Sequence, residues 1–404
     1  MITSLVRRGP CVLLPFNKKS LLLTIILLPS VLMWLYHLVP AIRSGLFQPI
    51  TSALSPPSDP TIAAEHRVPP IDLAAYPYSQ QSNLSVNLVI ATIASEDISW
   101  TSRLQIPNLN IVRYVSDEPT AQYHPPVPKG REALMYHTYL HDFYDALPDV
   151  SIFVHADEQP WHTDAELWDS MLFTLSNLDL AAVAERGYAN LRVNWYQACP
   201  DWINTTKSVE ESVKQEEPWM AAAFRANFGD EAEVPEILAG PCCSQFAVTR
   251  EAIRSRPREA YAQTQRWLVE TDWSDYIVGR IWERLWSYLF LEGRPTDCPV
   301  EWKAFCRMYG VCFPGPGAAG LDDFRALWAE RKGLVGRRGF WRELWDPQRA
   351  GHERARIGVL DRELDARLRD AMERGRSEKA AGGALQGGKQ QQQTLGDLFV
   401  DDTP

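Results

Sequence analysis

Short apolar runs alternate along the middle of the chain with longer stretches of helical periodicity. An uninterrupted apolar run rich in β-branched residues is typical of a strand buried on both faces. Apolar residues that recur every three or four positions are typical of an amphipathic helix. The predicted strands are 86–94, 110–115, 150–154, 187–195 and 241–250, and the predicted helices are 130–144, 163–177, 207–227 and 261–290.

This alternation predicts an α/β fold with a single mixed or parallel sheet flanked by helices. The predicted domain spans 86–313, which is long enough to bury a sizeable core. A charged helical extension, 314–376, follows it and begins with a Pro- and Gly-rich linker. The last segment, 377–404, has low complexity and predicts a disordered tail. We expect no chemistry in these C-terminal segments.

The N-terminal segment 21–39 contains no Asp, Glu, Lys or Arg. At about 1.5 Å per residue, a helix of this length spans a bilayer core of roughly 30 Å. More positive charges precede the segment than follow it, which places 1–20 in the cytoplasm and the rest of the chain in a lumen. A cleaved signal peptide is the alternative, although the apolar run exceeds the usual signal-peptide core. We predict a single-pass type II membrane protein of the Golgi or another secretory compartment, with 40–85 as its stem.

Composition narrows the class of protein. The net charge of −10 argues against a nucleic-acid partner, because phosphate binding needs a basic face. All cysteines except Cys11 follow the predicted anchor, and in an oxidising lumen they favour disulfides whose pairing stays open. Sequons at Asn83 and Asn204 suit the same compartment. The sequence has no P-loop, dinucleotide fingerprint or nucleophile elbow, which argues against P-loop kinases, dehydrogenases and α/β-hydrolases.

The central predicted strand, 150–154, ends directly in polar chemistry. His155, Asp157 and Glu158 follow it, and open α/β sheets bind ligands beyond the carboxyl ends of their strands. These side chains predict a divalent-metal site, for Mn²⁺ or Mg²⁺, beside a diphosphate. The alternative is a solvated acidic loop after an ordinary strand.

A second acidic pair, Glu96 and Asp97, follows the first predicted strand. At the carboxyl end of a strand, these residues are candidate contacts for the ribose or base of a nucleotide cofactor. The alternative is an acidic pair that favours the start of a helix.

Many stretches between Val86 and Cys312 resemble a fungal family catalogued only as a domain of unknown function, DUF3431. No reaction is established for this family. Its motifs make Arg131 and Glu132 candidate cofactor contacts, and Trp161 and His162 candidate substrate contacts. The resembling stretches include Glu96-Asp-x-x-Trp100, Lys129-Gly-Arg-Glu-Ala133, Phe153-x-His155-Ala156, Trp161-His162, Cys242-Cys-x-Gln-Phe-Ala-Val248 and Gly279-Arg-x-x-Glu283.

The order of a helix, Tyr-x-x-Leu-Pro-Asp, a strand with an acidic end and a later Arg-x-x-Glu also resembles GT-A-type glycosyltransferases. That resemblance implies a GT-A-like sheet whose Asp-x-Asp motif holds a divalent metal against a nucleotide-sugar diphosphate, with a glycan hydroxyl as acceptor. Here His155 replaces the first Asp and Asp157 is the second, and an imidazole suits Mn²⁺ less well than a carboxylate oxygen does. Gln245 and Phe246 are candidate acceptor-pocket residues, although core packing explains Phe246 equally well.

The acceptor hydroxyl needs a general base, for which Glu283 is the first candidate. Asp275 lies about two helical turns earlier on a similar face. Apolar and Trp neighbours favour a raised pKa for Glu283, whereas an ion pair with Arg280 is the alternative. We predict a lumenal glycosyltransferase. The alternatives are a glycoside hydrolase that uses Asp157 and Glu283, and a non-catalytic carbohydrate-binding protein.

Overall fold

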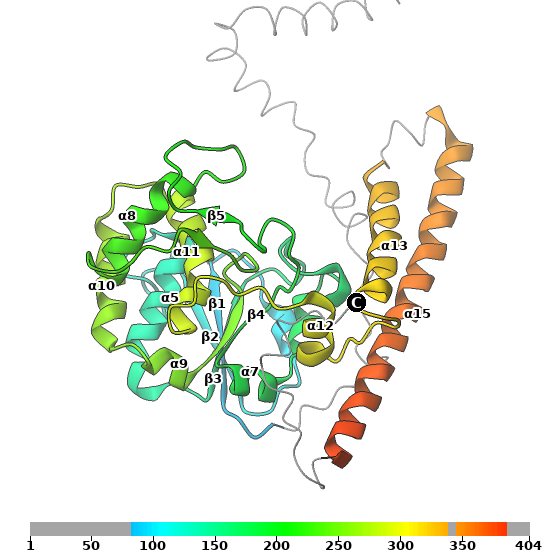
Figure 1. Ribbon diagram of the computed structural model, residues 1–404, viewed down its shortest axis with the longest axis horizontal. Coiled ribbons are helices and arrows are strands. Elements are labelled where there is room, and N and C mark those ends of the chain that lie inside the picture. Colours follow the sequence, from blue (N-terminus) through cyan, green and yellow to red (C-terminus); the bar gives the residue numbers. More distant parts are fainter. Residues whose placement is uncertain (1–81, 338–344, 386–404) are drawn as a thin grey trace, which may run out of the picture. The chain divides into compact units, whose positions relative to one another are not determined.

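The strands of the described residues form a central mixed sheet and a small two-stranded sheet. The computed structural model describes residues 82–337 and 345–385. In the larger sheet the strand order is β2-β1-β3-β7-β4, with helices on both faces (Figure 1). Its strands are β1 (Val86–Thr92), β2 (Leu109–Val115), β3 (Val150–His155), β4 (Tyr188–Asn190) and β7 (Phe246–Thr249). The predicted α/β class with a mixed sheet is confirmed.

Strand direction gathers the carboxyl ends of four strands at one edge. β1 is parallel to β2 and β3, whereas β7 is antiparallel to β3 and β4. The ends of β1, β2, β3 and β4 therefore lie together beside the start of β7, and we call this the carboxyl edge. β1 is buried along its whole length, which explains its uninterrupted apolar sequence. Successive side chains alternate, so Leu88 enters one hydrophobic core and Val89 the other.

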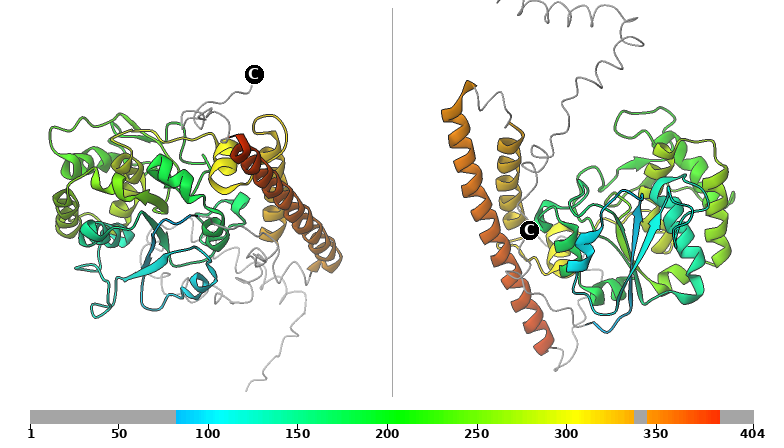
Figure 2. Two further views of the ribbon diagram at one scale, coloured as in Figure 1. Left: turned by 90° about the horizontal axis from the view of Figure 1, so that it is seen from below. Right: turned by 180° about the vertical axis from the view of Figure 1, so that it is seen from behind.

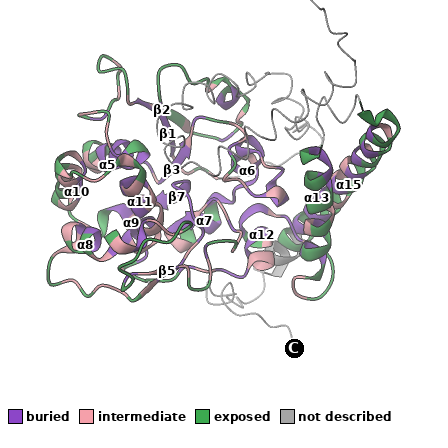
Figure 3. Cartoon of the chain, turned by 90° about the horizontal axis from the view of Figure 1, so that it is seen from above, coloured by how far each residue is buried: buried purple, intermediate pink, exposed green. Residues whose placement is uncertain are grey.

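The two larger cores of the described residues lie on opposite faces of the sheet, and buried residues concentrate along the strands (Figure 3). One core includes α5 (Arg131–Asp142), α8 (Glu217–Phe228), α9 (Arg250–Arg254), α10 (Arg258–Glu270) and α11 (Asp275–Phe290). The other includes α6 (Met171–Asn177), α7 (Leu180–Arg186) and α12 (Glu301–Tyr309). The shorter elements are η2 (Ser99–Arg103), η3 (Tyr144–Ala146), η4 (Ala165–Leu167), β5 (Ile203–Asn204) and β6 (Ile237–Leu238).

Three predicted helices have different boundaries in the structure. The stretch 163–177 divides into η4 and α6, because Ser170 begins α6 as a side-chain N-cap. The stretch 207–227 is a loop until α8 begins. The stretch 261–290 divides into α10 and α11, with Ser274 as the N-cap of α11. Capping residues inside amphipathic stretches thus mark breaks that periodicity alone does not show.

The C-terminal helices α13 (Ala319–Gly336) and α15 (Pro347–Leu385) lie side by side (Figures 1 and 2). Phe324 of α13 and Leu364 and Leu368 of α15 share the core that includes α6 and α12. The predicted charged extension is therefore packed against the α/β domain. α15 also continues past the predicted start of the tail at 377, because Glu, Lys and Ala in that segment favour a helix.

Asp149 fixes the chain at the opposite end of the strands, which we call the amino edge. The backbone N and Oγ of Ser85 donate to Asp149 Oδ2 at 2.8 and 2.7 Å. Arg250 Nη2 donates to Oδ1 at 2.8 Å. The hydrogen bonds from Ser85, with a smaller contribution from Arg250, lower the pKa of Asp149. The chain thus enters β1 at a site tied to the starts of β3 and α9.

The predicted cytoplasmic tail (1–20), anchor (21–39) and stem up to residue 81 lie outside the described residues. Within 82–337 and 345–385, no helix combines the length and apolar character needed to cross a membrane. The membrane topology therefore stays a prediction.

The six cysteines after the predicted anchor are joined in three disulfides. The pairs are Cys199–Cys298, Cys242–Cys243 and Cys306–Cys312. The expected use of these cysteines is confirmed, and the structure supplies the pairing that the sequence left open.

Candidate functional site

The carboxyl edge contains a topological switch point between β1 and β3. The chain leaves β1 to form β2 on one side and later forms β3 on the other, so the loops after β1 and β3 diverge. Open α/β sheets bind ligands in the crevice at such a point. Trp100 joins the two loops, because its Nε1 donates to the carbonyl oxygen of Ala156 at 2.7 Å. The predicted residues Glu96 and Asp97 lie in the loop after β1, and His155 is the last residue of β3.

The acidic pair after β1 holds its own loop together. Glu96 Oε2 accepts from the backbone N of Ile93 at 2.8 Å, and Asp97 Oδ1 accepts from the backbone N of Ser99 at 2.8 Å. The Ser99 hydrogen bonds lower the pKa of Asp97. Arg113 Nη2 donates to the carbonyl oxygen of Glu96 at 2.9 Å. These contacts give both acids a role in the turn, and a nucleotide contact stays a prediction.

Two of the predicted metal ligands, Asp157 and Glu158, contact different parts of the chain. Asp157 is exposed, and its Oδ1 accepts from the backbone N of Gln159 at 3.0 Å. Glu158 forms an ion pair with Arg103 at 3.2 Å. Among the described residues, no group of three possible metal-ligating side chains contains His155, Asp157 or Glu158. The residues as arranged do not form a closed metal site, so we derive no chemical step from a metal.

The rings of His155, Trp161 and His162 lie close together at the end of β3 and in the loop after it. The ring centres of His155 and His162 are 4.9 Å apart, and those of His162 and Trp161 are 4.1 Å apart. Burial, followed by the neighbouring His155, lowers the pKa of His162 to about 3, so this imidazole is neutral at physiological pH. Trp161 is 80% exposed, which leaves its ring accessible to a substrate.

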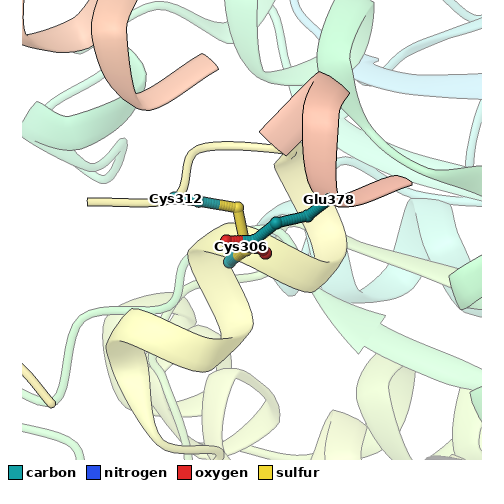
Figure 4. A group of neighbouring side chains, drawn as sticks. All are labelled: Cys306, Cys312 and Glu378. Atoms are coloured by element: carbon teal, nitrogen blue, oxygen red, sulfur yellow. Dashed lines mark hydrogen bonds between the residues drawn. A yellow bond between two sulfur atoms is a disulfide. The ribbon is translucent and has the colours of Figure 1, made fainter. Parts of the chain in front are cut away.

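Cys306, Cys312 and Glu378 form the one group of described residues with metal-ligand proximity (Figure 4). The two sulfur atoms are bonded to each other, and Cys306 Sγ lies 3.1 Å from Glu378 Oε2. A metal ligand of this kind must be a thiolate, which a disulfide does not provide. The group therefore links α12 and α15 without forming a metal site.

A buried polar chain reaches the carboxyl edge from α5 and α11. Ser244 Oγ donates to Glu132 Oε1 at 2.9 Å, and Trp286 Nε1 donates to Ser244 Oγ at 3.0 Å. The next residue, Gln245, places its Oε1 3.5 Å from the backbone N of His155, at the outer limit of a hydrogen bond. Glu132, Ser244 and Gln245 therefore lie beside the end of β3.

Glu283 of α11 lies near these buried polar residues and has a raised pKa. Its side chain is partly buried. Burial raises its pKa to about 7, and the negative charge of Glu132 adds to the rise, while Arg284 and Arg280 oppose it. The predicted raised pKa of Glu283 is supported, with Glu132 as a cause that the sequence did not reveal.

The alternative account of Glu283, an ion pair with Arg280, is not what the structure shows, because Arg280 pairs with Glu216. Arg280 Nε lies 2.7 Å from Glu216 Oε2, and Arg284 Nε lies 3.5 Å from Glu216 Oε1. Glu216 is fully buried, at the point where the loop before α8 ends. Sequence reasoning missed this acid because it assigned the whole stretch 207–227 to a charged amphipathic helix.

Asp275 joins the start of α11 to the start of α5. Its Oδ1 accepts from the backbone N of Gly130 at 2.8 Å, which is a structural role. Arg131 lies 5.5 Å from the ring centre of Tyr276. A Cβ atom at Gly279 would lie 3.2 Å from Arg131 Cδ, so the small residue leaves room for this side chain. Arg131 is itself exposed at the beginning of α5.

Phe246 is fully buried in an aromatic cluster. Its ring centre lies 4.7 Å from that of Phe153 and 5.0 Å from that of Trp286. This environment agrees with core packing, which was one of two accounts of Phe246. Gln245, its neighbour, is 1% exposed and contacts β3 rather than solvent.

A known protein family matches the part of the chain that contains this site. The family described as "Protein of unknown function (DUF3431)" matches residues 88–307, more than half of the chain. The chain belongs to the DUF3431 family. The DUF3431 match includes the carboxyl edge, Glu132 and Glu283, and it ends within α12, before α13 and α15. No curated protein and no solved structure matches the chain.

Within the DUF3431 region, Ser244 is the functional candidate that sequence reasoning missed. The matching stretch Cys242-Cys-x-Gln-Phe contains Ser244 at its variable position, so the motif drew attention to its neighbours. Its contact with Glu132 joins residues 112 positions apart. Burial of a hydroxyl beside an acid is visible only after folding.

Proposed function

We propose that this chain is a glycosyltransferase that moves a sugar from a nucleotide sugar to a hydroxyl of a glycan or glycoconjugate. The observation that carries the proposal is Glu283, a partly buried carboxyl with a pKa of about 7 next to the carboxyl edge. A general base is most effective when its pKa is near the working pH. The switch point between β1 and β3 supports binding of the nucleotide at the same edge.

In the proposed reaction, Glu283 takes the proton of the acceptor hydroxyl. The acceptor oxygen forms a bond to the anomeric carbon, and the bond from that carbon to the nucleoside diphosphate breaks. The diphosphate leaves with the electron pair. The guanidinium of Arg131, exposed at the start of α5, is available to offset the charge that builds on the diphosphate.

A divalent metal at Asp157 is a separate part of the proposal. Asp157 is exposed and accepts a hydrogen bond from Gln159, so it is accessible to an ion but lacks neighbouring ligands in the described residues. Metal dependence is therefore an outcome of the test below.

The first prediction is nucleotide-dependent thermal stabilisation of the purified full chain. Uridine and guanosine diphosphates are added with and without Mn²⁺, and the melting temperature is measured. A ligand present at about 100 times its Kd stabilises the folded state by about 2.7 kcal/mol. Glu283→Gln is expected to retain this stabilisation but to lose sugar transfer by about 10²–10⁴-fold, because a general base acts on the acceptor.

Asp157→Ala tests the metal. If Mn²⁺ increases the nucleotide effect, and Asp157→Ala removes only that increase, Asp157 is a metal ligand. An Mn²⁺-independent nucleotide effect assigns the site to protein groups alone. Absence of stabilisation by any nucleoside diphosphate or nucleotide sugar would contradict the transferase.

A glycoside hydrolase is the second candidate, and the proximity of Glu132 to Glu283 favours it. Hydrolases of this class use two carboxyl groups with different protonation states and need no nucleotide. This candidate pairs Glu283 with Glu132, whose charge raises the pKa of Glu283, as a second possibility beside the predicted Asp157. Glycan cleavage without any nucleotide response would favour the hydrolase, and glycan binding without turnover would favour a carbohydrate-binding protein.

A further inference from the structure

Ser244 can give its proton in only one direction. It is fully buried, so water does not compete for its hydroxyl. The indole N–H of Trp286 is a donor only, and it donates to Ser244 Oγ at 3.0 Å. The hydroxyl proton of Ser244 is therefore directed to Glu132 Oε1, 2.9 Å away. Residues far apart in the sequence thus fix one oxygen of Glu132.

The position of Glu132 matters because of what surrounds Glu283. On α11, Glu283 lies one turn after Gly279 and one turn before Trp286, on the same face of the helix. A Cβ atom at Gly279 would lie 3.2 Å from Cδ of Arg131, the neighbour of Glu132, and the Trp286 indole reaches Glu132 through Ser244. Glu132 of α5 is therefore close to Glu283, and the other charged groups that act on Glu283 are Arg280, Arg284 and Glu216. Both arginines form ion pairs with Glu216. Among the described residues Glu132 has no ion-pair partner, and its side chain accepts a hydrogen bond from Ser244. Its charge is therefore the acidic charge near Glu283 that no arginine offsets directly.

We propose that Glu132 is a positioning residue that sets the protonation state of Glu283, and that Ser244 and Trp286 hold Glu132 in place for this purpose. The inference rests on the proposed function, since it affects catalysis only when Glu283 exchanges a proton with a substrate. A carboxyl pair of this kind keeps Glu283 able both to take and to return a proton near neutral pH.

The test is a carboxyl titration of the full chain labelled with ¹³C at the glutamate carboxyl carbons, followed by NMR. The signal of Glu283 is assigned by its loss in Glu283→Gln. In Glu132→Gln, the negative neighbour is removed, so the midpoint of the Glu283 titration should fall by roughly one pH unit. Glu132→Asp keeps the charge and should stay close to the wild type. The acidic limb of any pH–rate profile should move with the midpoint.

Ser244→Ala provides a second, independent variant. Without the hydroxyl, Glu132 is free to rotate away from Glu283, and the midpoint should fall by a smaller amount. Near-UV circular dichroism checks that each variant is folded. If Glu132→Gln does not fold, the Glu283 midpoint in Ser244→Ala tests the proposal. An unchanged Glu283 midpoint in the folded variants would overturn the proposal. Because the titration needs no substrate, it gives its answer even if the chain transfers no sugar.

Discussion

At the scale of single residues, burial has the largest influence on Glu283, the proposed general base. Burial is the largest cause of the raised pKa of Glu283, which is about 7 in the folded chain against an ordinary value of 4.5. The folded state therefore binds a proton at Glu283 more tightly than the unfolded state does. The stability that this preference contributes is fully present below pH 4.5 and is lost as the pH rises through 7.

Glu283→Gln should remove this pH dependence. Between pH 5 and pH 8 the wild type should lose on the order of 1–3 kcal/mol more unfolding free energy than the variant, because only the wild type must ionise a buried carboxyl. Urea denaturation at both pH values measures the difference. The comparison is needed because the pKa of Asp164, about 7, and that of Asp169, about 6, are also raised by burial.

The matched control is Glu259→Gln, at an exposed position in the first turn of α10. This variant should keep the pH dependence of the wild type. Equal pH dependence in Glu283→Gln and the wild type would show that Glu283 is not ionising in this range.

Residue-level prediction succeeded where a side chain's own neighbours in sequence set its environment. Glu283 lies next to Trp282, and burial raises its pKa as expected, although four charged residues also act on it. It did not reveal hydrogen-bond partners that are distant in the sequence. Asp275 has the right helical spacing for a base, yet it bonds to Gly130, 145 positions away. Spacing along a helix does not reveal which surface the helix packs against.

At the scale of elements, the strands were easier to predict than the helix boundaries. β1 and β3 are buried along nearly all of their length, so their sequences carry a strong apolar signal. The antiparallel direction of β7 is not encoded in its own residues and depends on pairing with β3 and β4. The sequence indicated that α13 and α15 are helical but not that they share a core with the sheet.

This shared core predicts a specific dependence of stability on α13. Phe324→Ala should destabilise the chain by about 3–5 kcal/mol, because it leaves a cavity beside buried rings. Phe324 is fully buried, with its ring centre 5.1 Å from that of Phe313 and 6.0 Å from that of Trp328. Chemical denaturation measures the loss.

Asp323→Ala is the control on the same helix, since Asp323 is exposed. It should change stability by no more than about 0.5 kcal/mol. Similar small effects in both variants would show that α13 does not contribute to the core.

At the scale of the whole molecule, two disulfides close loops of very different size. Cys199 and Cys298 are 99 positions apart, whereas Cys306 and Cys312 are 6 apart. In the chain-entropy account, a longer loop restricts the unfolded chain more. The cross-link between Cys199 and Cys298 should therefore matter more for global stability.

Replacing both members of a pair by Ser tests this order. Removal of Cys199–Cys298 should cost about 4–5 kcal/mol, and removal of Cys306–Cys312 about 2 kcal/mol, in equilibrium unfolding without reductant. A larger loss from the short loop would contradict the entropic account and would point to the packing of α12 against α15.

The bonds of Ser85 to Asp149 have a practical consequence for orientation. They secure the point at which the polypeptide reaches the amino edge, opposite the switch point and Glu283. Any attachment made upstream of residue 82, whether to a bead, a chip or a bilayer, therefore connects to the body of the protein at the amino edge. Immobilisation through the N-terminal side therefore keeps the linkage away from the carboxyl edge and leaves that edge accessible to added ligands.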